Sequence, residues 1–362
     1  MYVKSVSVII PAYKPDEKLL ATLSDLVQTG FTDILVVDDG SGAPFAPIFE
    51  QVKAIPECTL LRHEVNRGKG AALKTAMRFF LDNRPEGAGV VTADADGQHL
   101  AADIAAVAQA MLEKGSLILG VRDFSAPDVP PRSKTGNRIT IAVFRLFFGM
   151  KISDTQTGLR AFPRKYIAEI AAVSGDRYEF ETNMLFLASR NKLPLDEVKI
   201  HTVYIEENRS SHFRVVRDSL RIYALIIKYL VSSVGSAVLD EGVFYLFKRL
   251  LGSGVLLGLL PATYIAAFLA RVISSLFNYF VNAKVVFGGS TGKKTLIRYY
   301  ILAAVQLALS ATLVFLLEKG LSVSSPALST LIKTLIDTFL FFFSFRIQHK
   351  WVFNTEKERR EV

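Results

Sequence analysis

Short apolar runs alternate with amphipathic stretches in the first part of the chain, from residue 1 to about residue 220. The runs are three to five residues long, rich in Val, Ile and Leu, and most are followed by a polar loop. Such runs predict buried strands, and the stretches between them predict helices, so the alternation indicates a doubly wound, mostly parallel α/β sheet. The predicted strands are Val6–Ile10, Ile34–Val37, Thr59–Leu61, Val90–Ala93 and Leu117–Val121, and the predicted helices are Glu17–Thr29, Gly70–Asn83 and Ala102–Lys114.

The pattern changes near residue 220, where long apolar segments begin. Each of four segments is close to the ~20 residues that an α-helix needs to span a bilayer. We therefore expect an α/β domain over residues 1–220 and an all-α domain of about four transmembrane helices over residues 221–362. An even number of spans places both chain ends on one side of the membrane. The segments lie near residues 222–247, 261–283, 296–317 and 327–347.

Charge is divided unevenly between the two parts. Residues 1–220 hold 27 basic and 27 acidic side chains, whereas residues 221–362 hold 16 and 7, so the net charge of +9 belongs to the apolar half. A basic excess beside apolar segments is typical of membrane flanks and argues against a nucleic-acid partner. Eleven Lys and Arg residues flank the segments on the side of the first domain and three on the other side. The positive-inside rule then places the first domain and both termini in the cytoplasm of a multi-pass membrane protein.

Composition and the N-terminal residues exclude further classes. With 50% hydrophobic residues and a mean hydropathy of +0.30, the chain is too apolar to be disordered or an ordinary soluble protein. Its single cysteine, Cys58, excludes an internal disulfide. The first apolar run, Val6–Ile10, has the length of a strand and lacks a secretory cleavage pattern, so we expect no signal peptide.

The apolar half contains a repeat. Phe277–Phe287 matches Phe343–Phe353 position by position, sharing phenylalanines, an amide, a lysine and a valine, and Ile227–Tyr229 resembles Ile297–Tyr299. Two helical hairpins in parallel orientation follow from this match, related by an axis along the membrane normal.

The repeat suggests partners for charges within the spans. Arg271 corresponds to Asp337 when the first match is extended towards the N-terminus, and intramembrane charges usually find partners, so one hypothesis is an Arg271–Asp337 ion pair at the repeat interface. Two alternatives stay open. Lys333 lies four residues before Asp337 on one helical face, and Asp240 or Glu241 is a second candidate partner of Arg271.

The loops after the predicted strands carry the candidate chemistry. Asp94 and Asp96 follow the strand Val90–Ala93, and their alternate spacing points both carboxylates into one pocket. Hard oxygen ligands in this place suit Mg²⁺ or Mn²⁺ held between the protein and a diphosphate. A solvated turn is the alternative that explains most isolated triplets of this kind.

Two further loops support this interpretation. Lys69 lies in the run Asn66–Gly70, which offers a flexible backbone, a helix N-terminus and a cation, all suited to phosphate. Asp38 and Asp39 offer acceptors for a base or a ribose. On its own, the run Asn66–Gly70 is also explained as the start of a helix. Asp38 and Asp39 on their own are explained equally well as part of a polar turn.

Four motifs in order carry a family resemblance: Val8–Tyr13, Val37–Ser41, Asn66–Gly70 and Asp94–His99. Over about residues 5–215 the chain resembles glycosyltransferase family 2, and more closely its polyprenyl-phosphate sugar synthases of the dolichyl-phosphate mannose synthase type. The resemblance implies a GT-A fold and an inverting transfer of a hexose from a nucleotide sugar to a polyprenyl phosphate at the cytoplasmic membrane face. A UDP-hexose is the favoured donor and GDP-mannose the alternative.

The resemblance also implies roles for single residues. For Mg²⁺ or Mn²⁺ it implies Asp94, Asp96 and Gln98. For the nucleotide sugar the candidates are Pro11, Ala12, Tyr13, Asp38, Asp39, Lys69, Asp94 and Ala95. For the acceptor phosphate they are Arg122, which with Asp94 and Asp96 is also a catalytic candidate, and Arg132, Arg138, Arg209, His212 and Arg214.

Some positions depart from the family pattern or have a second interpretation. Many members continue the first motif as Tyr-Asn-Glu, whereas this chain has Tyr13, Lys14 and Pro15, so the sequence does not decide between guanine and uracil. The run Asn208–Arg214 is equally a basic juxtamembrane flank. Ile139–Met150 is either a helix at the membrane interface or a buried core helix. Glu179 and Glu181 are better explained as a helix N-terminal turn than as sugar contacts.

The second half, over about residues 222–353, resembles the GtrA-like membrane domain, whose helices end in aromatic-Asn and Val-Phe signatures. That resemblance implies moving or presenting polyprenyl-phosphate sugars for cell-surface glycosylation, and plain anchoring is equally compatible. A processive polysaccharide synthase is disfavoured because the only tryptophan, Trp351, lies outside any Gln-x-x-Arg-Trp motif. A non-enzymatic lipid carrier is the remaining alternative. The sugar, the lipid length and any homo-oligomer are not determined by the sequence.

Overall fold

The structure is a computed structural model whose internal contacts divide the chain into two units, Met1–Ile222 and Tyr223–Val362. Each unit is described by itself. The residues that the structure describes are 2–124, 131–201, 224–251, 255–256, 260–289, 291–322 and 325–353.

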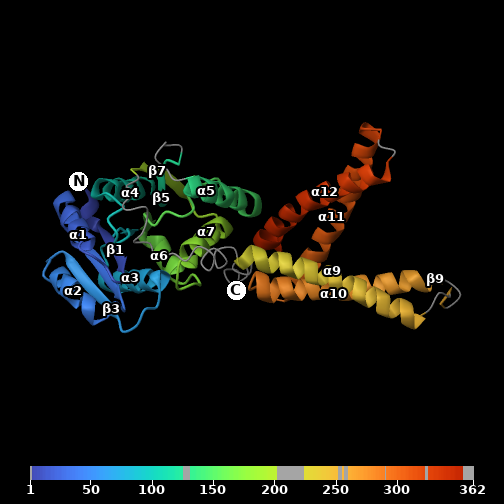
Figure 1. The fold of residues 1–362 in the computed structure, drawn as a ribbon, viewed down its shortest axis with the longest axis horizontal. Coiled ribbons are helices and arrows are strands. Elements are labelled where there is room, and N and C mark those ends of the chain that lie inside the picture. Colours follow the sequence, from blue (N-terminus) through green and yellow to red (C-terminus); the bar gives the residue numbers. More distant parts are fainter. Residues whose placement is uncertain are drawn as a thin grey trace. The chain divides into compact units, whose positions relative to one another are not determined.

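A seven-stranded mixed sheet organises the first unit (Figure 1). Strand order is β3-β2-β1-β4-β6-β5-β7, and only β6 runs against its neighbours β4 and β5. This topology confirms the predicted doubly wound, mostly parallel α/β class. All five predicted strands are present, and β6 and β7 are additional. The strands are β1 (Val6–Ala12), β2 (Ile34–Asp39), β3 (Cys58–His63), β4 (Gly89–Thr92), β5 (Leu117–Arg122), β6 (Arg160–Pro163) and β7 (Leu195–Ile200).

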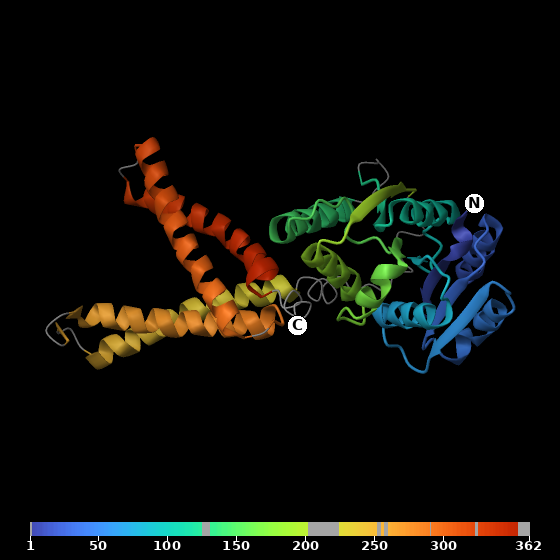
Figure 2. The ribbon, with the colours of Figure 1, turned by 180° about the vertical axis from the view of Figure 1, so that it is seen from behind.

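Helices cover both faces of this sheet. On α1, Leu19, Leu23 and Leu26 repeat at helical spacing and are fully buried in the same core cluster as side chains of α2 and α4. The other face carries α3, which contacts β1, β2, α6 and α7. Figure 2 shows these layers from behind. The helices are α1 (Lys18–Thr29), α2 (Ala46–Lys53), α3 (Lys69–Asn83), α4 (Ala101–Lys114), α5 (Pro131–Val143), α6 (Arg164–Ala171) and α7 (Glu179–Asn191).

The apolar run after residue 138 forms the end of α5 and a π-helical turn, η3 (Phe144–Phe148). Phe144 and Phe147 are buried, and the ring of Phe144 stacks on Phe186 of α7 at 5.2 Å between centroids. Leu146 is exposed. One side of this run therefore belongs to the protein core, as the core-helix interpretation requires.

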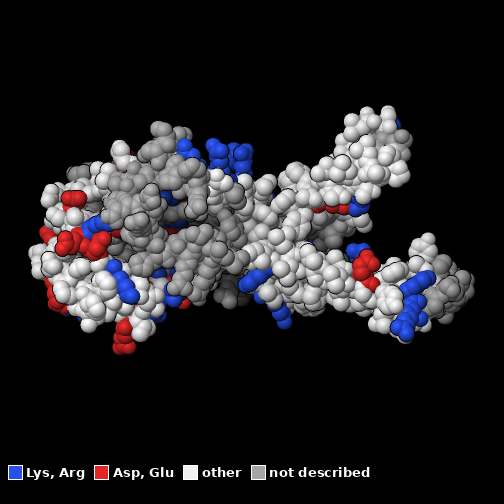
Figure 3. All heavy atoms as spheres, viewed as in Figure 1, with Lys and Arg blue, Asp and Glu red and all other residues white. Residues whose placement is uncertain are grey.

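Four helices of the second unit are long and apolar enough to cross a membrane. Their outward side chains, such as Leu307 and Phe268, are largely exposed, as is expected of surfaces that face lipid. Figure 3 shows mostly uncharged surface on these helices. The chain is therefore a membrane protein with four candidate spans. The helices are α9 (Ala224–Leu251), α10 (Ala262–Val281), α11 (Lys293–Gly320) and α12 (Pro326–Ile347).

Equivalent residues of the sequence repeat contact each other. α10 continues into the π-helical turn η5 (Asn282–Val286) and α12 into η6 (Gln348–Val352), and the two turns occupy equivalent positions of the repeat. Asn282 Nδ2 donates to Gln348 Oε1 at 3.0 Å, and the rings of Phe287 and Phe353 stack at 5.4 Å. Contacts between equivalent residues are expected for residues close to an axis that relates the two hairpins.

The hypothesised Arg271–Asp337 ion pair is wrong. Arg271 Nη2 lies 3.0 Å from Asp240 Oδ2, whereas Lys333 pairs with Asp337, so both alternatives hold. Each carboxylate also accepts from a serine hydroxyl on the other helix of its hairpin, Asp240 from α10 and Asp337 from α11. Equivalence in the repeat does not imply contact at every position. These charges find partners within their own hairpins, because the neighbouring helix or the next turn is nearer.

A charge exchange tests this pairing. We expect Arg271→Asp alone to lower the yield of folded membrane protein, because it places two carboxylates next to each other on neighbouring spans. The double variant Arg271→Asp with Asp240→Arg should recover folding, since the ion pair is re-formed. The measurement is the amount of monodisperse protein that is extracted in detergent. Recovery instead by Arg271→Asp with Asp337→Arg would contradict the observed pairing.

Candidate functional site

Polar loops gather at the carboxyl edge of the parallel strands. Strands β1, β2 and β4 end in Ala12, Asp39 and Thr92, and the loops that follow lie side by side. The backbone N–H of Lys14 donates to Ser41 Oγ at 2.9 Å, which ties the first two loops together. Ligands of open α/β sheets bind at this edge.

Lys69 joins two carboxylates from distant parts of the chain. As the first residue of α3, it places Nζ 2.6 Å from Asp94 Oδ1 and 3.0 Å from Glu181 Oε1. Glu181 lies in the first turn of α7, as predicted, but its side chain also reaches this cluster. Glu179 makes the expected N-terminal contacts, accepting from the backbone N–H groups of Asp176 and Arg177.

The two aspartates of the loop after β4 differ in their electrostatics. Burial on its own would raise the pKa of Asp94, but Lys69 outweighs it and lowers the pKa to about 2. The pKa of Asp96 is raised, first by burial and then by the charge of Asp94. His99 Nδ1 accepts from the backbone N–H of Asp94 at 3.1 Å, and burial lowers the pKa of that imidazole. A neutral histidine therefore fixes the loop while Asp94 stays ionised.

This donor set fits a divalent cation shared with a substrate. Within the described residues, no group of three or more His, Cys, Asp or Glu side chains is arranged to hold a metal. Asp94 and Asp96, two residues apart in the sequence, both offer carboxylate oxygens. Gln98 is held beside them because its backbone N–H donates to Asp96 Oδ1 at 3.1 Å. Magnesium characteristically takes one or two carboxylates together with substrate phosphates, so two carboxylates suffice.

Asp39 holds the loop that precedes α3. Its carboxylate accepts from the backbone N–H groups of Arg67 and Gly68, at 2.9 and 2.7 Å, and from Asn66 Nδ2 at 3.0 Å. His63 Nδ1 lies 2.7 Å from the same carboxylate. These contacts of Asp39 hold Lys69 at the start of α3. The sequence did not indicate this role of Asp39.

Asp38 and the first loop complete this side of the site. Asp38 accepts from the backbone N–H of Ser41 at 2.9 Å and from Arg62 Nε at 3.2 Å. Ala12 is buried, while Pro11 and Tyr13 are partly exposed. Lys14 has a left-handed backbone with φ of 51°, which asparagine tolerates better than lysine.

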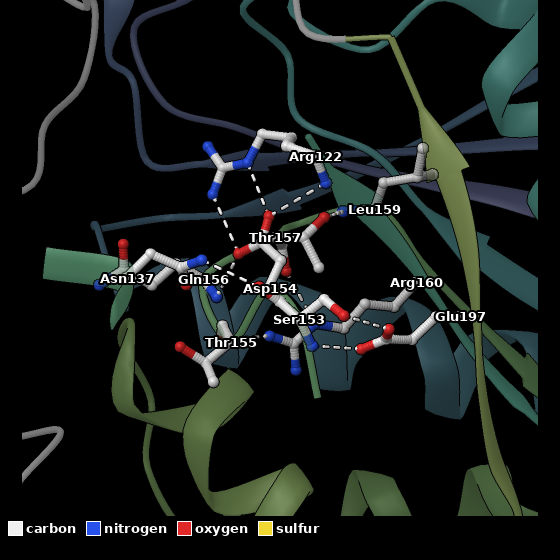
Figure 4. Close-up of polar contacts among 10 residues, drawn as sticks. All are labelled: Arg122, Asn137, Ser153, Asp154, Thr155, Gln156, Thr157, Leu159, Arg160 and Glu197. Carbon is white, nitrogen blue, oxygen red and sulfur yellow. Dashed lines mark hydrogen bonds and ion pairs between the residues drawn. The ribbon is translucent and has the colours of Figure 1, made fainter. Parts of the chain in front are cut away.

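Arg122 ends β5 in an ion pair with a fully buried carboxylate (Figure 4). Its Nε lies 2.7 Å from Asp154 Oδ2 and its Nη2 3.2 Å from Oδ1, a two-point contact that fixes the plane of the guanidinium. A buried carboxylate needs such a partner, because an isolated charge away from water is costly. The side chain of Arg122 is 26% exposed, and its guanidinium lies 5.0 Å from the centroid of the Phe124 ring.

The loop from Ser153 to Leu159 connects Arg122 to Asp94. Arg160, which is 1% exposed, donates to the backbone oxygens of Thr157, Thr155 and Glu181, and so fastens this loop to the start of α7. A Cβ added at Gly158 would lie 2.5 Å from Asp94 Oδ2, so glycine makes room for that carboxylate. This loop was not predicted from the sequence, although its polar run Asp154-Thr-Gln-Thr-Gly158 before a strand was a usable signal.

The remaining candidates for the acceptor phosphate are less defined. Arg138 lies on α5 with an exposed side chain, and Arg132 lies in the first turn of α5. Arg209, His212 and Arg214 lie outside the described residues. The structure brings together Lys69, Asp94 and Glu181, with Asp96 and Gln98 in the adjoining loop, and it joins Arg122 to this group through the Ser153–Leu159 loop.

Two family models and several curated proteins match this chain. Residues 7–171 match the model for glycosyl transferase family 2, and residues 228–353 match that for the GtrA/DPMS transmembrane domain. An uncharacterised protein of Methanocaldococcus jannaschii is 31% identical over 228 residues, covering 62% of this chain and 91% of that protein. The UDP-N-acetylglucosamine–dolichyl-phosphate N-acetylglucosaminyltransferase of Methanococcus voltae is 28% identical over 244 residues, covering 62% and 96%.

Among solved structures, glucosyl-3-phosphoglycerate synthase from Mycobacterium tuberculosis is similar with a TM-score of 0.47 and 16% identity, over 64% of this chain and 80% of that one. The two family models cover both units of the chain, and the first spans the loops that hold Lys69 and Asp94. The chain belongs to glycosyl transferase family 2 and carries a GtrA/DPMS transmembrane domain.

Proposed function

We propose that the protein transfers a hexosyl unit from a nucleotide sugar, a UDP-hexose in preference to GDP-mannose, to the phosphate of a polyprenyl phosphate at the cytoplasmic face of the membrane. The observation that carries this proposal is the set of paired charges at the carboxyl edge of the sheet, Lys69 with Asp94 and Arg122 with Asp154, in a chain with four candidate spans. The relative from Methanococcus voltae supports it, since its name pairs a UDP-sugar with a dolichyl phosphate.

The residues would divide the chemistry between leaving group and nucleophile. Asp94 and Asp96, with Gln98 beside them, would hold Mg²⁺ or Mn²⁺, which would neutralise the departing diphosphate. Lys69 would add a cation on the same side. Arg122 would bind the acceptor phosphate and offset the repulsion between two anionic reactants.

No general base is needed for this reaction. A phosphate monoester has a second pKa near ~6, so at neutral pH it is largely dianionic and is already a nucleophile. The protein then has to align the acceptor oxygen with the anomeric carbon, opposite the leaving diphosphate. Such in-line displacement inverts the anomeric configuration. The membrane domain would keep this site at the bilayer surface, where the phosphate of the lipid lies.

A donor panel tests the proposal. Purified full-length protein in detergent is incubated with Mn²⁺, polyprenyl phosphate and one nucleotide sugar at a time, and the released UDP or GDP is measured. We expect release from one UDP-hexose, dependent on the lipid phosphate and stopped by EDTA. Nucleotide release from GDP-mannose alone would show that GDP-mannose, and not a UDP-hexose, is the donor. Equal release with and without the lipid would contradict the proposal that polyprenyl phosphate is the acceptor.

A further inference from the structure

Lys69 occupies the place where a cation is needed, although it is itself a cation. Its Nζ lies 2.6 Å from Asp94 Oδ1, on the carboxylate that the proposed function assigns to the divalent metal. The side chain of Lys69 is 17% exposed, and that of Asp94 is 31% exposed. A largely enclosed ammonium therefore already neutralises the candidate metal ligand. A divalent cation on Asp94 would repel it, because both would share one carboxylate.

Glu181 offers Lys69 a second partner. Its Oε1 is 3.0 Å from Nζ, and its side chain is 12% exposed. The backbone oxygen of Glu181 accepts from Arg160 Nη1 at 2.6 Å, which fixes the start of α7 against the Ser153–Leu159 loop. The backbone of Glu181 is thus held in position independently of Lys69. If the enclosed ammonium left Asp94 without another partner, the buried unpaired charge would cost free energy. Glu181 offsets that cost because it supplies a second carboxylate.

Backbone geometry restricts Lys69 to this neighbourhood. The preceding residue, Gly68, has φ of 104°, and a Cβ there would lie 2.4 Å from the backbone oxygen of Asp176. The backbone N–H of Gly68 is also held by Asp39 at 2.7 Å. The start of α3 is therefore fixed, and only the flexible side chain of Lys69 is able to turn between Asp94, Glu181 and a bound diphosphate.

We propose that Lys69 is an internal occupant of the metal site, which leaves Asp94 for Glu181 and the donor diphosphate when the nucleotide sugar and its divalent cation bind. Glu181 is then a positioning residue that acts through Lys69. This inference rests on the proposed function, because it takes Asp94 as a metal ligand. Binding of the metal alone is opposed by the Lys69–Asp94 contact, and a diphosphate relieves that opposition by giving the ammonium an anionic partner.

Binding of Mn²⁺ without nucleotide measures this competition directly. Full-length protein in detergent is titrated with Mn²⁺, and free Mn²⁺ is followed by electron paramagnetic resonance. We expect Lys69→Met to bind Mn²⁺ at least about five-fold more tightly than the unmodified protein, the lower end of typical site-to-site coupling. We expect Glu181→Gln to bind it more weakly, because Lys69 is left with Asp94 alone. Lys74→Met is the matched control, since Lys74 also lies on α3 in an ion pair, with Asp176 at 2.6 Å.

A double variant separates displacement from plain charge effects. If Glu181 acts through Lys69, Glu181→Gln should leave Mn²⁺ affinity unchanged in the Lys69→Met background. The same weakening in both backgrounds would overturn the inference, because it would show independent electrostatic contributions. Thermal melting checks each variant, and Lys69→Gln replaces Lys69→Met if the latter fails to fold.

The same titration tests the role of Lys69 separately from the proposed transferase activity. Equal Mn²⁺ affinity for the unmodified protein and Lys69→Met would overturn the role of Lys69 and leave the transferase proposal standing. No binding of Mn²⁺ by any variant, even with UDP present, would contradict the metal site on which both depend.

Discussion

Substitution of Asp96 by Asn should strongly slow sugar transfer while leaving the protein folded. Asparagine keeps the shape of aspartate and an oxygen that accepts from the backbone N–H of Gln98, so the loop is preserved. The lost charge belongs to a carboxylate proposed to hold the cation that stabilises the departing diphosphate. Such transition-state charge stabilisation is worth several kcal/mol, so we expect a fall in kcat/KM of about 10³-fold.

A surface variant controls for the charge change. Asp25 on α1 is an exposed aspartate, and Asp25→Asn should leave transfer unchanged. The rate of lipid-linked product formation is measured for both variants at saturating Mn²⁺, with melting temperatures to confirm folding. Activity of Asp96→Asn within a few-fold of the unmodified protein would contradict the assignment of Asp96.

Substitution of Arg160 by Met should strongly destabilise the first unit. Arg160 is almost completely buried, and burial lowers its pKa without removing its charge-assisted hydrogen bonds to three backbone oxygens. Methionine fills a similar volume but leaves those carbonyls unpaired. A buried acceptor left without its donor typically costs about 1–3 kcal/mol, so the loss of three donors predicts a fall of at least roughly 10 °C in melting temperature.

Activity should fall together with stability in this variant. Arg160 fastens the Ser153–Leu159 loop to α7, and that loop reaches both Arg122 and Asp94, so the site should loosen even in the folded fraction. Arg78→Met, an exposed arginine on α3, should change neither property. Differential scanning calorimetry of the full-length protein in detergent gives the melting temperature. An unchanged melting temperature for Arg160→Met would show that the loop is held by other contacts.

The strands and loops next to the first half of the site could be predicted from local sequence. The runs Val6–Ile10, Ile34–Val37 and Val90–Ala93 are apolar and bounded by polar residues, and each forms a strand that ends at the site. Their parallel order then brings Asp39 and Asp94 to one edge, because the carboxyl ends of neighbouring parallel strands coincide.

The second half of the site depends on contacts that local patterns do not encode. Glu181 reaches Lys69 from a distant part of the sequence, and nothing in its surroundings distinguishes it from an ordinary helix-start glutamate. Strand β6 is short and begins with Arg160, a residue type that is rarely buried, so its place between β4 and β5 was missed. In the membrane unit the repeat identified equivalent residues, yet Arg271 pairs within its hairpin.

Analysis of the lipid product tests whether the sugar is transferred to a lipid phosphate. Full-length protein in detergent is given the radiolabelled donor identified by the panel, Mn²⁺, and either polyprenyl phosphate or the unphosphorylated polyprenol of equal length. We predict label in the organic phase with the phosphate only, in a product that mild acid cleaves to free sugar. Equal labelling of the alcohol, or no organic-phase label while nucleoside diphosphate is still released, would show that the lipid phosphate is not the acceptor.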